Sequence, residues 1–303
     1  MPYALVIHCV SPSGTLYPED LQGHKALALF LEQLIQTQDA ALATQLHAPS
    51  QAKAFTTAIL VPPSTRPRGP APHAKAHETG RQVSEVPIRI TLLDDTLYQP
   101  VSQFFLQHLH TIPLLRLGHA PLLVARVLTT PESGEPWAGC APFATLLAQA
   151  STDDTAWSLQ FVTPTVFKTG EADVPLPLPR LCFQSWLTSW DTHAPQPFFS
   201  DREARRAFLT EVVERGVSVT YEHIHMAHMP LYFNGVRTRE QGFVGTCRFL
   251  VRPSHTAPAT RKILATLAAY SYYAGTGRKT TMGMGLTRQL TSGGHSHGRS
   301  RHD

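Results

Sequence analysis

The chain has 303 residues, about twice the usual size of one domain, so its length favours two domains. Hydrophobic residues make up 42% of it and charged residues 16%, which excludes a disordered chain and favours a folded core. The net charge of +4 is small for this length, so any surface for an anionic partner must be local.

The four cysteines stand singly in the sequence, at Cys9, Cys140, Cys182 and Cys247. None has the paired spacing of a zinc ribbon or a thioredoxin-like redox motif, so we expect reduced thiols in packed positions. Residues 3–10 are apolar but lack a basic leader, and no run of about eighteen apolar residues follows them. These features predict a cytoplasmic protein without a membrane span.

The first half of the chain alternates between strand-like and helix-like patterns. Residues 3–10 form a β-branched apolar run that ends at a Ser-Pro-Ser-Gly turn, which predicts a buried strand. After residue 21, apolar side chains recur every three or four positions, which predicts a helix. Further strands are predicted at residues 55–61, 88–93 and 121–128, a second helix at 101–108, and an exposed loop at 62–82. The order β-α-β-β-α-β is that of the ferredoxin-like unit, which RNA-recognition modules share.

The same order recurs in the second half. Strands are predicted at residues 158–168, 217–233, 243–251 and 286–290, and helices at 178–190, 202–215 and 258–274. We therefore predict an α+β protein of two tandem ferredoxin-like (RRM-like) βαββαβ domains packed side by side. The N-terminal domain would span residues 1–150 and the C-terminal domain residues 151–291. The Gly, Ser, His and Arg residues of 292–303 predict a disordered tail.

A glycine-rich segment with a basic centre follows the last predicted helix. It contains Gly275, Gly277, Arg278, Lys279, Gly283 and Gly285. Glycines let the backbone approach an anion closely, and the two cations supply charge against phosphate. A P-loop is excluded because Arg278 and Tyr273 stand where its glycines would be. A tight structural turn is the alternative to a phosphate-binding loop.

Several segments resemble one family of RNA-processing proteins. The glycine-rich segment, residues 242–250 and residues 161–167 (Phe-Val-Thr-Pro-Thr-Val-Phe) are similar to the CRISPR-associated repeat-processing endoribonucleases, the Cas family numbered six of the RAMP superfamily. The likeness extends over most of residues 3–290, with a departure at Thr276, where that family usually has a hydrophobic residue. It implies a metal-independent endoribonuclease, without a cofactor, that cuts CRISPR repeat RNA (precursor crRNA) into guide RNAs and leaves a 2′,3′-cyclic phosphate.

The resemblance also implies where partners bind. We expect RNA to contact the glycine-rich segment and the strand after it, through Gly275, Gly277, Arg278, Lys279, Gly283, Gly285 and Arg288. The resemblance also allows two further kinds of partner, other CRISPR effector subunits and a second copy of the chain. We expect no contact with a membrane.

Cutting RNA without a metal requires groups that accept and donate protons near neutral pH, and histidine suits both tasks. We expect His47, in a loop after the first helix, to be catalytic because the resembling family places its histidine there, with Lys53 as its electrostatic partner. His24 in the first helix is the second candidate, and Tyr17 is a further acid–base candidate. Packing is the alternative role for each of them, since the chain has 16 histidines.

A second group of histidines, His223, His225 and His228, falls in a predicted strand, where His223 and His225 would share one face. No carboxylate or cysteine stands at ligand spacing, so we expect no metal site there and favour contact between this face and RNA. We also expect basic residues near the C-terminus to line one side of an RNA groove; they are Arg261, Lys262, Arg278, Lys279 and Arg288.

Two other functional classes remain open on the sequence. A non-catalytic RNA-binding subunit of a CRISPR effector complex would use the same fold and the same glycine-rich segment. A pair of ferredoxin-like domains acting on small metabolites would have no affinity for RNA. A non-catalytic subunit would bind repeat RNA without cutting it, whereas an endoribonuclease would cut it. A protein that acts on small metabolites would not bind RNA at all.

Overall fold

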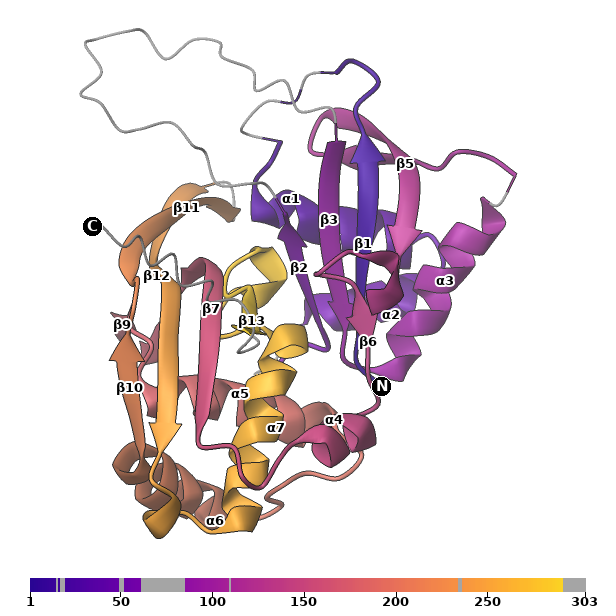
Figure 1. The fold of residues 1–303 in the computed structure, drawn as a ribbon. Helices are drawn as coiled ribbons and strands as arrows, with labels where there is room; N and C mark the ends of the chain where they lie inside the picture. Colours follow the sequence, from indigo (N-terminus) through magenta and orange to yellow (C-terminus); the bar gives the residue numbers. More distant parts are fainter. Residues whose placement is uncertain are drawn as a thin grey trace, which may run out of the picture.

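The computed structural model describes residues 1–14, 16, 20–48, 52–60, 85–108, 110–233 and 236–290. In these ranges the chain forms two halves, each with an antiparallel sheet and helices against it (Figure 1). No helix among the described residues is long and apolar enough to cross a membrane. The predicted loop at 62–82, the predicted tail at 292–303 and the candidate Tyr17 lie outside the described residues.

The N-terminal half is built on a sheet with the strand order β2-β3-β1-β5-β4, and β6 also pairs with β1. Its strands are β1 (Tyr3–Val10), β2 (Phe55–Ile59), β3 (Glu85–Leu92), β4 (Leu114–Leu117), β5 (Ala120–Leu128) and β6 (Gly139–Cys140). Its helices are α1 (Gly23–Ala28), continued by the π-helical η1 (Leu29–Ile35), α2 (Ala40–His47), the short η2 (Asp95–Leu97), α3 (Tyr98–Gln107) and η3 (Pro131–Ser133).

The C-terminal half contains a sheet with the strand order β10-β12-β7-β13, and β11 extends it beside β12. Its strands are β7 (Ala156–Thr165), β10 (Val217–Tyr221), β11 (His225–Phe233), β12 (Val236–Val251) and β13 (Thr287–Leu290), with a separate hairpin of β8 (Phe167–Thr169) and β9 (Ala172–Val174). Its helices are α4 (Phe143–Gln149), α5 (Pro179–His193), α6 (Arg202–Ala207) continued by η4 (Phe208–Glu214), η5 (Pro253–His255), α7 (Pro258–Ala274) and η6 (Thr280–Met282).

The strand orders confirm two tandem ferredoxin-like units. In each half the first strand lies between the third and the last strand of the β-α-β-β-α-β unit, so β1 and β7 are central. The apolar run of β1 is continuous because both of its faces are buried: Leu5 and Ile7 belong to the core under the N-terminal helices, and Ala4 to the core of the C-terminal half.

Two details of the predicted fold were wrong or incomplete. Residues 217–233 are two strands and not one, because the backbone N–H groups of Glu222 and His223 both donate to Thr246 O and turn the chain between β10 and β11. The helix α4 lies before residue 150, yet Phe143 and Leu146 pack in the core of the C-terminal half. The division of the chain at residue 150 stays a prediction.

Buried polar contacts connect the two halves where α7 ends. The Arg89 side chain on β3 is 1% exposed, and its Nε and a terminal N–H group donate to Trp137 O at 3.0 Å and Tyr272 O at 2.7 Å. Its guanidinium carbon also lies 4.5 Å from the centre of the Tyr272 ring. Thr91 Oγ1 donates to Tyr273 O at 2.9 Å. These contacts hold the end of α7, and thus the start of the glycine-rich segment, against the N-terminal sheet.

Candidate RNA-binding and catalytic site

The glycine-rich segment, which we call the glycine loop (residues 275–285), depends on glycine for its shape. Gly277 has φ +82, and a Cβ there would lie 2.4 Å from Val166 O. Gly285 has φ +69, and a Cβ there would lie 2.0 Å from Thr276 O. Both the positive φ and the close backbone contact exclude a side chain at these positions. Among the described residues Lys279 alone has a positive φ without being glycine, at 59°.

Thr276 fixes the base of the glycine loop from inside. Its side chain is fully buried, and Oγ1 accepts the Trp186 Nε1–H at 2.8 Å and shares a hydrogen bond with Thr287 Oγ1 at 2.7 Å. Its backbone N–H donates to Gly285 O at 2.8 Å, which closes the loop. A polar side chain is therefore accommodated here because its hydroxyl group has hydrogen-bonding partners within the core.

The far end of the glycine loop lies against the N-terminal half, as Figure 1 shows for the yellow segment beside β2. Thr57 Oγ1 on β2 donates to Thr281 O at 2.7 Å. A Cβ on Gly23, at the start of α1, would lie 1.9 Å from Met282 O, so the backbones of α1 and the loop are in direct contact. The candidate His24 follows this contact by one residue.

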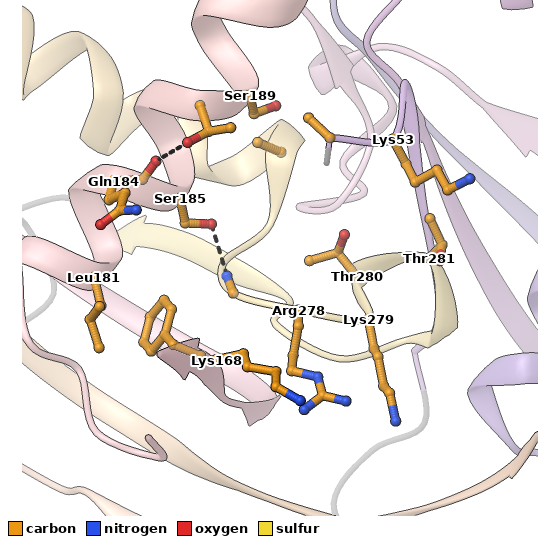
Figure 2. A pocket seen from close by; sticks show the side chains of 15 residues that line it. Lys53, Lys168, Leu181, Gln184, Ser185, Ser189, Arg278, Lys279, Thr280 and Thr281 are labelled. Carbon is orange, nitrogen blue, oxygen red and sulfur yellow. Dashed lines mark hydrogen bonds between the residues drawn. The ribbon is translucent and has the colours of Figure 1, made fainter. Parts of the chain in front are cut away.

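A cavity of about 400 Å³ opens between the glycine loop, α5 and the segment before β2. Figure 2 shows Gln184 and Ser185 of α5 on one wall, with Lys53 across the cavity from them. The Ser185 Oγ accepts the Gly277 N–H at 3.0 Å, which joins the loop to α5. The basic residues that line the cavity are Lys53, Lys168, Arg278 and Lys279. The structure thus brings the predicted Lys53 and the predicted loop cations into one site.

His47 is the exposed last residue of α2, so the prediction that it lies in a loop is wrong. The helix forms because Asp39 caps it, accepting the Leu42 N–H at 2.9 Å. At the other end the Lys53 ammonium donates to Leu46 O at 2.8 Å and to Ala48 O, the carbonyls on either side of His47.

Lys53 therefore touches the backbone around His47 and also lines the cavity. Partial burial lowers the pKa of the Lys53 ammonium from its ordinary value. The helix carbonyls that it caps favour its positive charge. His47 itself is not among the described residues that line the cavity.

His24 is half-buried in α1. Burial first, and the charge of the neighbouring Lys25 second, lower the pKa of His24 from its ordinary value of 6.5. The neutral imidazole is consequently the favoured form near neutral pH.

The remaining predicted basic contacts lie in different places. Arg278 and Lys279 form ion pairs at the loop with Asp173 and Glu240. Arg288 lies on β13, where Nε donates to Gln160 Oε1 at 2.8 Å, and it is not one of the cavity's lining residues within the described chain.

Other expectations need correction. Arg261 is 9% exposed and donates to Thr152 O and Thr256 O, so it holds α7 in place and is not available for RNA. His223 lies in the turn before β11 and His225 begins β11, so the two do not share a strand face. Cys140 is exposed, whereas the other three cysteines are buried as expected. In the described part of the chain no group of three or more His, Cys, Asp or Glu could hold a metal ion.

The polar wall of α5 was not predicted from the sequence. Gln184, Ser185 and Thr188 line the cavity from one face of the helix. The opposite face holds the buried Phe183 and Trp186. The signal was present, because polar residues at positions i, i+1 and i+4 of a predicted helix share a face. Nothing in the sequence pattern singled out the carboxylates Glu240 and Asp173.

Comparisons with known proteins agree over nearly the whole chain. The family description "CRISPR Cas6 N-terminal domain" matches residues 1–148, and "CRISPR-associated endoribonuclease Cas6" matches residues 159–287. A solved Cas6 from Thermus thermophilus is 27% identical, with a TM-score of 0.68 over 96% of this chain and 98% of that one. A solved Cas6 product complex is 28% identical, with a TM-score of 0.75 over 96% of this chain and 100% of that one.

A curated relative adds a match in sequence. The CRISPR-associated endoribonuclease Cas6 of Mycobacterium tuberculosis is 31% identical over 134 residues, which are 43% of this chain and 37% of the relative's length. The matched sequence thus spans little more than a third of that relative. Together, the two family matches and the shared tandem ferredoxin-like architecture show that the chain belongs to the Cas6 family of CRISPR-associated proteins.

Proposed function

We propose that the protein is an endoribonuclease that cleaves CRISPR repeat RNA, the precursor crRNA, into guide RNAs. One observation carries the proposal most: Lys53, which contacts the backbone on both sides of His47, lines the same cavity as Arg278 and Lys279 of the glycine loop. A candidate catalytic segment from one half and a candidate phosphate-binding loop from the other thus meet at one place. Family membership supports the same reaction, and one solved relative is described as a product complex.

RNA binding would rest on the glycine loop and the cavity beside it. Its cations can contact phosphodiesters, and the hydroxyl and amide groups of α5 can hydrogen-bond an unpaired nucleotide. An A-form stem offers mainly shape and phosphates to such a surface, so recognition of the repeat would combine a stem with a flanking single strand.

The proposed chemistry is transfer within the RNA, without a metal. The neutral His24, favoured by its lowered pKa, accepts the 2′-hydroxyl proton while the 2′-oxygen bonds to the adjacent phosphorus. The bond from phosphorus to the 5′-oxygen breaks, and His47 donates a proton to that oxygen. Lys53 stabilises the negative charge that develops on the phosphate. The products would be a 2′,3′-cyclic phosphate and a 5′-hydroxyl, and Tyr17 keeps no assigned step.

The proposal is tested by incubating repeat RNA with the protein in EDTA, comparing the wild type with His47→Ala and His24→Ala. We expect the wild type to cut and to leave a cyclic phosphate, and each substitution to slow cleavage about 10² to 10⁴-fold with RNA affinity retained. Loss of wild-type cleavage in EDTA would contradict metal independence. Binding without any cleavage would support a non-catalytic subunit of an effector complex.

Three further parts of the proposal concern assembly and location. We propose association with other CRISPR effector subunits, formation of a homodimer and a cytoplasmic location, where the precursor transcript would be met. Mass measurement of the purified protein with and without repeat RNA tests the homodimer directly.

A further inference from the structure

The two cations of the glycine loop already have anionic partners within the protein. Lys279 Nζ lies 2.5 Å from Glu240 Oε1 on β12, and Arg278 Nη1 lies 2.5 Å from Asp173 Oδ1 on β9. The second oxygen of Glu240, Oε2, lies 4.0 Å from Arg278 Nη2. Each oxygen of one carboxylate therefore faces one of the two loop cations.

The pair of Lys279 and Glu240 is the more sheltered of the two contacts. The side chains of Lys279 and Glu240 are 22% and 15% exposed, whereas Asp173 is 51% exposed. Reduced exposure limits screening by solvent and salt, so the sheltered pair is the stronger competitor. The backbone of Lys279 is also fixed, because its carbonyl accepts the N–H groups of Met282 and Met284.

Arg278 and Lys279 extend from the loop in the same direction, as Figure 2 shows, and a single anion can face both. A carboxylate that presents one oxygen to each cation resembles, in charge and geometry, the two non-bridging oxygens of a phosphodiester. We propose that Glu240, assisted by Asp173, is an internal substitute for RNA phosphate, which RNA must displace from Arg278 and Lys279 in order to bind. This inference rests on the proposed RNA-processing function.

The consequence is a uniform penalty on RNA binding at the loop. An RNA that offers only phosphates must replace ion pairs that the protein already makes, so the net gain in binding free energy is small. A repeat RNA makes additional contacts elsewhere on the protein, so it can meet the same penalty and still bind tightly. Glu240 thereby weakens the retention of RNA of any sequence at the loop, and it leaves the ratio of the affinities for repeat RNA and other RNA unchanged.

The test compares the affinity for repeat RNA and for a scrambled RNA of equal length in the wild type, Glu240→Gln and Glu171→Gln. Glu171 is the matched control, because it lies in the turn between β8 and β9 and is fully exposed at 103%, and its 4.0 Å contact leaves the half-exposed cavity residue Lys168 already accessible to RNA. We expect Glu240→Gln to lower Kd for both RNAs about tenfold, the value of one good ionic contact. We expect Glu171→Gln to change Kd less than about twofold, as a removed surface ion pair does.

Salt dependence gives a second readout that a purely structural role would not move. Releasing Lys279 and Arg278 to contact an additional phosphate should steepen the slope of log K against log salt by about 0.7 in Glu240→Gln. An unchanged slope with unchanged affinity would overturn the proposal, and so would equal effects of Glu240→Gln and Glu171→Gln.

A variant at the half-exposed Asp173 provides a second test if Glu240→Gln fails to fold. Asp173→Asn removes the partner of Arg278 with less effect on packing, and we expect it to raise RNA affinity in the same direction. Weaker RNA binding by both variants would show that the carboxylates only support the loop, and the proposal would be wrong. A wild type that binds no RNA would instead contradict the proposed function itself.

Discussion

Burial alters the proton affinity of His24, the side chain that follows the contact between α1 and the glycine loop. Its pKa lies below the ordinary 6.5, so it is neutral in a wider pH range than a free histidine. A general base must be neutral to accept a proton, so it is active above its pKa. Its activity is lost as the pH falls below that pKa. We therefore expect the acid limb of kcat/KM for cleavage to have its midpoint below pH 6.5, measured from about pH 5 to 8.

The comparison variants for this pH profile are His24→Ala and His110→Ala. The first should lose the acid limb together with most of the activity. The second changes an exposed histidine outside the site and should leave the profile unchanged. A wild-type midpoint at or above 6.5, or an acid limb that survives in His24→Ala, would exclude His24 as the base.

Candidate site residues were chosen from the sequence by the chemistry of each side chain, but their partners in space were not. Lys53 was expected beside His47, and the loop cations were expected to bind RNA; the structure shows that they line one cavity, and their roles stay predictions. Glu240 was not predicted because its partner Lys279 is distant along the chain, and an ion pair between two separate segments leaves no periodic pattern. The role of Thr276 was missed for the same reason, since its partner Trp186 comes from α5.

At the scale of elements, the glycine loop is the part whose backbone tolerates least change. We expect Gly285→Ala to lower the free energy of unfolding by about 3 kcal/mol, the upper part of the usual range, because the new Cβ would collide with Thr276 O. Repeat RNA should bind about tenfold more weakly, since the loop cations would be displaced. Urea unfolding and RNA titration measure the two effects.

Gly134→Ala is the matched control for the loop. Gly134 also has a positive φ, +76, but its Cβ would meet nothing within 4 Å. It should therefore show only the cost of the backbone conformation, about 1 kcal/mol, and no loss of RNA affinity. If both alanine variants lowered the free energy of unfolding equally, the close contact at Gly285 would contribute nothing to the cost of the substitution.

The long elements with a clear apolar pattern were predicted, whereas the shorter α2, α4 and β4 were not. The helix α2, which carries His47, was missed because Ala43 is its only buried residue, so no hydrophobic stripe marks it. The turn between β10 and β11 was missed because its residues, Glu222, His223 and Ile224, include neither glycine nor proline.

At the scale of the whole molecule, two repeated units line one cavity at their junction. The repeat itself was visible in the order of predicted elements, but the faces that meet were not. Arg89 illustrates the reason: its sequence position suggests an ordinary strand residue, yet its guanidinium is buried between the halves and donates to Trp137 O and Tyr272 O. Burial of this charge lowers its pKa, and the backbone carbonyls provide its hydrogen bonds.

The central claim, that the junction cleaves repeat RNA through its own 2′-hydroxyl, is tested most directly with one modified substrate. After the cleaved bond has been mapped, the nucleotide on its 5′ side is replaced by the 2′-deoxy form, and binding and cleavage are measured in EDTA. The account predicts an unchanged Kd, within about twofold, and no cleavage at that bond. Cleavage of the deoxy substrate at the same bond would show that water or another group attacks the phosphate, and the account would be wrong.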